Sequence, residues 1–69
     1  MNKKKLKAAI AEHGETQKIL AEALGISRVT LCRKMSEKAE AVFTQPEISF
    51  IKKRYGLTDE AVSAIFFAD

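Results

Sequence analysis

One stretch of the sequence, residues 16–36, constrains the fold more than any other. It holds two segments of helical periodicity separated by Gly25, which can take the left-handed conformation that ends a helix. Apolar residues of both segments share one face, and these are Leu20, Leu24, Ile26, Leu31 and Met35. The stretch therefore predicts two short helices that meet at a tight turn and bury a common apolar seam.

The start of each predicted helix has a capping residue. Thr16 precedes the first helix and Ser27 the second, and each hydroxyl can accept a hydrogen bond from a backbone N–H of the first turn. Ile26 can pack on Leu31 as a hydrophobic staple. Because such a cap is typically worth about 1 kcal/mol, this junction is well specified.

A polar, basic face lies opposite the seam on the second helix. With Leu31 and Met35 directed inward, the outward side chains are Arg28, Val29, Cys32, Arg33 and Ser36. Such a face suits the DNA major groove, where arginine can bond guanine and valine can contact a thymine methyl. Gln17 and Lys18 lie at the positive end of the first helix, where they can contact a phosphate.

Composition limits the classes of protein to which this chain can belong. The 69 residues allow a single domain over 1–69, and 46% hydrophobic residues suffice for a packed core. One cysteine and one histidine are too few for a disulfide or a structural zinc site, so we expect no metal or cofactor. No apolar run approaches the roughly 18 residues of a membrane span, so we expect a cytoplasmic protein with no membrane partner and no small-molecule ligand.

The charge is unevenly distributed along the chain. Residues 1–38 hold nine Lys/Arg against four Asp/Glu, whereas residues 39–69 hold three against five. A basic N-terminal half suits a polyanion, although charge alone fits an ordinary solvated surface equally well.

Three further helices are predicted around this stretch. The first covers about residues 3–13 and ends at Gly14, with His13 on its apolar face in a structural role, since no partner at a useful spacing indicates a ligand. Thr44 caps the next helix in a capping box with Glu47, and Thr58 caps the last. In the segment 37–43, Lys38 either touches a phosphate or is a plain solvated lysine.

The last predicted helix finishes with three large apolar residues, Ile65, Phe66 and Phe67. One helix face cannot bury all three in a chain of this size. Either Ile65 and Phe66 close the core while Phe67 frays, or the three form the contact of a symmetric dimer. We favour the homodimer, because reading two half-sites about 34 Å apart requires two recognition helices.

The run from Thr16 to Met35 resembles the helix-turn-helix of the Cro/repressor family of phage and bacterial regulators. The matching residues are TQ at the start, L-A-E-x-L-G-I-S in the middle and R-x-T-L after it. The resemblance implies an all-α, compact five-helix bundle of the lambda-repressor-like type. It also implies a repressor or Cro-like regulator that binds a palindromic operator in double-stranded DNA and blocks transcription.

By the same resemblance, Gln17 contacts the DNA at the start of the first helix. Arg28, Val29 and Arg33 read the major groove, and Ser27 and Thr30 contact phosphates. Two positions depart from the family pattern. Lys34 stands where an apolar residue is common, so we expect Met35 to take the buried place, and Ile19 replaces a frequent glutamate of a capping box.

Two other functions compete with DNA binding. The same fold could serve as a protein-binding module, such as an antitoxin or anti-regulator, that uses its apolar last helix. An enzyme, for example a small nuclease, would need clustered carboxylates or histidines, and the sequence contains no nucleophile–base–orienter set. We therefore expect no catalysis.

Overall fold

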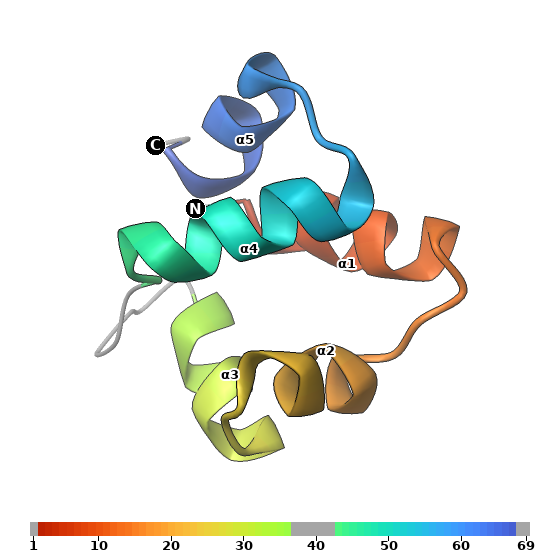
Figure 1. The fold of residues 1–69 in the computed structure, drawn as a ribbon, viewed down its shortest axis with the longest axis vertical. Coiled ribbons are helices and arrows are strands. Elements are labelled where there is room, and N and C mark those ends of the chain that lie inside the picture. Colours follow the sequence, from red (N-terminus) through yellow and green to blue (C-terminus); the bar gives the residue numbers. More distant parts are fainter. Residues whose placement is uncertain (1, 37–42, 68–69) are drawn as a thin grey trace.

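The computed structural model describes residues 2–36 and 43–67, and within these ranges it contains five α-helices and no strand. Figure 1 shows their arrangement. The elements are α1 (Lys3–Glu12), α2 (Gln17–Leu24), α3 (Arg28–Met35), α4 (Gln45–Tyr55) and α5 (Asp59–Phe66). The predicted all-α, five-helix bundle is confirmed.

The helix-turn-helix lies at one end of the molecule. In Figure 1, α2 and α3 lie together at the bottom, α4 crosses the middle and α5 lies at the top. The second helix packs on α1 and α3, and α5 packs on α1 and α4. The Asn2 N–H donates to the Ile65 carbonyl over 2.6 Å, which joins the start of α1 to the end of α5.

Side chains from all five helices meet in one apolar core. The largest fully buried ones are Leu6, Leu20, Leu31, Met35 and Ile51. Because Met35 has no exposed surface, the prediction that it takes the buried place next to Lys34 is confirmed. Leu24 and Ile26 pack against this core from its edge. The predicted seam between α2 and α3 is therefore part of the main core.

The predicted helix starts are confirmed at four junctions. The hydroxyls of Thr16, Ser27, Thr44 and Thr58 each accept a hydrogen bond from the backbone N–H three residues later, over 3.1–3.3 Å. Thr44 and Glu47 form the reciprocal capping box. A fifth cap was missed, because the Asn2 side chain accepts from the Lys5 N–H over 3.1 Å.

Gly25 (φ +74°) ends α2 in the left-handed conformation as predicted, and Gly56 (φ +60°) ends α4 in the same way. His13 forms the C-cap of α1. Its Nδ1 lies 2.9 Å from the Ala9 carbonyl oxygen, and its ring lies 4.8 Å from that of Tyr55. These contacts are structural. None of the helices in the described ranges has the length and apolar character that a bilayer crossing requires.

Candidate nucleic-acid interface

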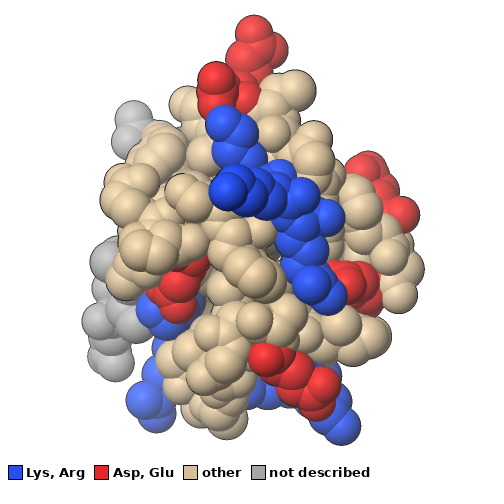
Figure 2. Space-filling model, viewed as in Figure 1, with Lys and Arg blue, Asp and Glu red and all other residues tan. Residues whose placement is uncertain are grey.

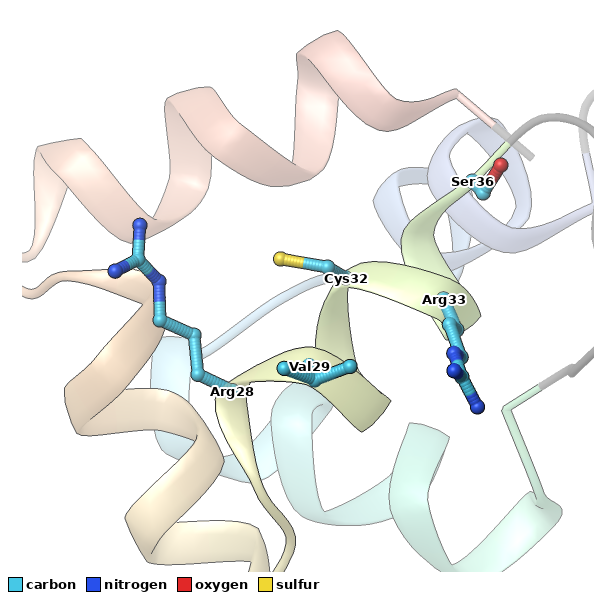
Figure 3. Close-up of a pocket in the computed structure, with 5 residues that line it drawn as sticks. All are labelled: Arg28, Val29, Cys32, Arg33 and Ser36. Atoms are coloured by element: carbon cyan, nitrogen blue, oxygen red, sulfur yellow. The ribbon is translucent and has the colours of Figure 1, made fainter.

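The outward face of α3 forms a shallow hollow on the surface. Five residues line it, namely Arg28, Val29, Cys32, Arg33 and Ser36 (Figure 3). They are the five residues that the sequence places opposite the seam. Val29 is 62% exposed, whereas Leu31 is completely buried. The rotation of α3 therefore directs Leu31 into the core and this polar set toward solvent.

The two arginines lie at different ends of this face. Arg28 belongs to the first turn of α3 and Arg33 to the last, and Figure 3 shows Val29 and Cys32 between them. An α-helix with its side chains is about 10–12 Å across, close to the roughly 12 Å width of the major groove. The face thus combines two separated guanidinium groups with a small apolar centre on an element that fits the groove.

The start of α2 is joined to this face by one hydrogen bond. The Cys32 thiol donates to the Gln17 Oε1 over 3.4 Å, which brings the Gln17 amide next to the centre of α3. Lys18 follows it in the first turn and is exposed. The start of α2 therefore lies beside the outward face of α3 at Gln17.

Ser27 and Thr30 are tied to each other at the start of α3. The Ser27 hydroxyl accepts from the Thr30 N–H over 3.1 Å, and the two side-chain oxygens are 2.8 Å apart. One hydroxyl hydrogen is used between them, so the other can be donated to a phosphate. Lys38, the last residue predicted to contact DNA, lies outside the described residues.

Ion pairing separates the basic residues of the chain into two groups. Arg54 bonds Glu15 over 2.5 Å, Lys34 bonds Glu47 over 2.8 Å, and Lys52 pairs with Asp59. Within the described residues, Lys18, Arg28 and Arg33 form no ion pair, and neither do Lys53 and the lysines of α1. The cations of the α2–α3 surface therefore remain available to an anionic partner.

The basic run at the end of α4 has a different environment. Figure 2 shows a strip of basic side chains over this region with acidic side chains at its two ends. Lys52 and Arg54 of this run are paired with carboxylates of other elements. The pair of Arg54 with Glu15 joins residues 39 positions apart, so the local sequence does not indicate it.

The pKa shifts agree with this pairing. The hydrogen bonds from Arg54 and then Tyr55 lower the pKa of Glu15, and the bond from Lys52 lowers the pKa of Asp59. Burial acts to raise the pKa of Glu47, but its bonds from Lys34 and Thr44 outweigh this and lower it. These carboxylates therefore stay ionised and paired near neutral pH.

The three residues predicted for dimerisation do not share one exposed patch. Ile65 is 4% exposed and lies in the core, because it is on the inward face of α5 with Val62. Phe66 is partly buried, with its ring 5.3 Å from that of Phe43 in an edge-on contact. Phe67 follows α5 as its C-cap and is 59% exposed. Of the three, only Phe67 is largely exposed.

Among the described residues, no group of three or more His, Cys, Asp or Glu side chains could hold a metal ion.

Comparison with known families finds a match to the model described as bacterial regulatory protein, Fis family, over residues 1–37. This span is more than half of the chain and contains α1, α2 and α3. No curated protein and no solved structure matches the chain significantly.

Proposed function

Since this chain belongs to the Fis family of bacterial regulatory proteins, it is a helix-turn-helix DNA-binding transcription regulator, and we propose that it acts as a repressor of the Cro or phage-repressor type. In this proposal the exposed face of α3 enters the major groove of a specific operator. Binding at a site that overlaps a promoter then blocks polymerase sterically. The proposal includes no catalytic step and no cofactor, and it places the protein with the DNA in the bacterial cytoplasm.

The observation that carries the proposal is the unpaired charge on α3. Arg28 and Arg33 form no ion pair within the described residues, and they flank Val29, which is 62% exposed. Two arginines held without a carboxylate partner favour an anionic ligand. Guanidinium groups can bond guanine O6 and N7 in pairs, which gives sequence specificity as well as affinity.

Each predicted contact has a role in this complex. Arg28, Val29 and Arg33 read base edges, and Cys32 and Ser36 lie at the edge of the groove. Phosphates are contacted by a second set, which comprises Gln17, Lys18, Ser27, Thr30 and Lys38. Contacts to phosphate fix the register of the helix, while contacts to base edges specify the sequence.

We also propose that two copies bind a palindromic operator. Phe67 is a large apolar side chain at the end of α5 with 59% of its surface exposed, which suits a symmetric contact between copies. Two recognition helices about 34 Å apart would then read successive half-sites. Self-association through Phe67 can be measured without DNA, so this part of the proposal is tested separately from the DNA contacts.

Selection of bound duplexes from a random pool tests the proposal. We expect the wild type to enrich a palindromic consensus. Arg28→Ala with Arg33→Ala should abolish enrichment, whereas Lys5→Ala with Lys53→Ala removes the same charge from exposed sites on α1 and α4 and should preserve it. If the wild type enriches no sequence, the proposal is wrong and a protein-binding module becomes the better account.

A further inference from the structure

One helix outside the matched span contacts the helix-turn-helix at two points. In the first turn of α4, Glu47 bonds Lys34, which belongs to the last turn of α3. At the other end of α4, Arg54 and Tyr55 bond Glu15, the residue before the α2 cap. The beginning and the end of the helix-turn-helix are therefore held by the two ends of a single helix.

The contact at Glu47 is built around one oxygen. Its Oε1 accepts the Thr44 N–H over 2.8 Å and the Lys34 ammonium over 2.8 Å. The side chains of Lys34 and Glu47 are only 13% and 17% exposed. Because the pair is largely shielded from water, its geometry is better fixed than that of a surface ion pair.

The end of α3 depends on such tertiary contacts. Whereas α2 and α4 close on left-handed glycines, α3 ends at Ser36 in an extended conformation. The Lys34 ammonium also lies 5.9 Å from the centre of the Phe43 ring, which packs edge-on against Phe66. Lys34 thus links the last turn of α3 to residues of α4, α5 and the segment before α4.

Lys34 follows Arg33 directly, so a displacement of one side chain around the helix axis displaces the other. We propose that Lys34 and Glu47 are positioning residues that fix the rotation of α3, and that Lys34 itself does not contact DNA. Their pairing sets the direction of Arg33 and Val29 and thereby the discrimination between operator and other sequences. This inference rests on the proposed function and deepens it.

Two substitutions test the pair with little disturbance of the fold. Glu47→Gln removes the negative charge but keeps the capping box, because glutamine also serves at this position. Lys34→Met removes the positive charge and keeps an unbranched side chain of similar length. Asp59→Asn is the matched control, since it makes the same charge change in the Lys52–Asp59 pair at the start of α5.

The affinity for a selected duplex is measured against that for a scrambled one, over a range of salt and together with Tm. Glu47→Gln and Lys34→Met should each lower the ratio of the two affinities by roughly 3- to 20-fold. The double variant should lose no more than either single one, and Asp59→Asn should match the wild type. The salt slope of Lys34→Met should equal that of the wild type.

Each result that would overturn the inference is distinct in these measurements. If Lys34→Met weakens binding to all duplexes equally and lowers the salt slope by about 1, then Lys34 is a phosphate contact and the inference is wrong. If Glu47→Gln distinguishes the selected duplex from the scrambled one as well as the wild type does, the inference is also wrong. A wild type that discriminates no sequence overturns the proposed function, and this inference with it.

A second measurement needs no DNA. Residual dipolar couplings of the free protein report the angle between α3 and α4. We expect this angle to change, or to become averaged, in Glu47→Gln while the angle between α1 and α5 stays the same. An unchanged α3–α4 angle would contradict the positioning role.

Discussion

Two basic helices of this protein, α3 and α4, differ in which of their cations are paired: in α3 only Lys34 has a carboxylate partner among the described residues. In α4, Lys52 and Arg54 are paired with Asp59 and Glu15. In α3, Arg28 and Arg33 have no such partner within the described ranges. By count, α1 carries four basic residues and α3 and α4 carry three each, so charge alone does not single out α3. Pairing separates α3 from α4, because within the described residues the two arginines on the outer face of α3 remain available to an anionic partner.

The positions of the two helices in the fold explain this difference. The fourth helix crosses the middle of the molecule (Figure 1). Carboxylates of neighbouring elements pair there with Lys52 and Arg54. The third helix lies at one end and has only its inner face covered. On its outer face, Arg28 and Arg33 pair with no carboxylate of the described residues. Substitutions on each helix test this contrast between α4 as a supporting helix and α3 as a binding helix.

The largest effect, on the free energy of unfolding, is expected for a substitution on the inner face of α3. Leu31 is completely buried, so Leu31→Ala should lower the free energy of unfolding by about 2–5 kcal/mol through lost burial and the cavity left behind. Val29→Ala, on the outer face of the same helix, should change it by less than about 0.5 kcal/mol. Urea denaturation of both variants measures this. Equal losses would mean that α3 does not have one buried and one exposed face.

The next effect concerns DNA recognition. Arg28→Ala should cost about 1–3 kcal/mol at one operator base pair and relax the preference there, because a bidentate contact to guanine is lost. Lys53→Ala, which removes an exposed cation from α4, should leave the preference unchanged. Competition binding with single-base operator variants measures both. If the loss is equal on all sequences, Arg28 contacts a phosphate instead.

A smaller effect is expected for self-association. Phe67→Ser should weaken it roughly tenfold or more, because the substitution removes the largest exposed apolar group at the end of α5. Phe50→Ser on α4 is the control, since Phe50 is 38% exposed and lies beneath the Arg54 guanidinium. Sedimentation equilibrium gives the association constants. A large fall in Tm for Phe67→Ser would instead assign Phe67 to the core.

The smallest expected effect is on the pH dependence of stability, through the hydrogen bonds that Arg54 and Tyr55 of α4 donate to Glu15. Because its bond from Arg54 lowers the pKa of Glu15, this carboxylate stabilises the fold above its ordinary pKa, and the contribution is lost as the pH falls through the lowered value. Glu15→Gln should therefore have a lower Tm at pH 7. The difference from the wild type should shrink below about pH 4.5, the ordinary pKa of glutamate. A constant difference would exclude this cause.

The sequence predicts local features of this protein well. Thr16, Ser27, Thr44 and Thr58 were identified as caps because a cap depends on residues only three positions apart. The inward face of α3 was predicted because periodicity alone determines which side chains share a face. Asn2 could have been found by the same capping rule, since asparagine is a favoured cap.

Long-range pairs were not predictable in the same way. Nothing in the local sequence brings Glu15 to Arg54 or Lys34 to Glu47, because these contacts depend on how α4 packs across the molecule. The same limit applies to the end of α5, where the pattern left open whether Ile65 and Phe66 close the core or all three apolar residues form one patch; the structure buries Ile65, partly buries Phe66 and exposes Phe67. The candidate site could be predicted because most of it lies on one helix.

The salt dependence of DNA binding tests the central claim most directly. Fluorescence anisotropy with a selected duplex is measured between 50 and 200 mM salt. If Lys18 and Lys38 are the cations that contact phosphates, the affinity of each subunit should fall roughly tenfold over this range. Lys18→Ala should lower the slope by about 1, and Lys53→Ala should leave it unchanged. An affinity that is independent of salt would contradict the claim that unpaired cations on this surface bind DNA.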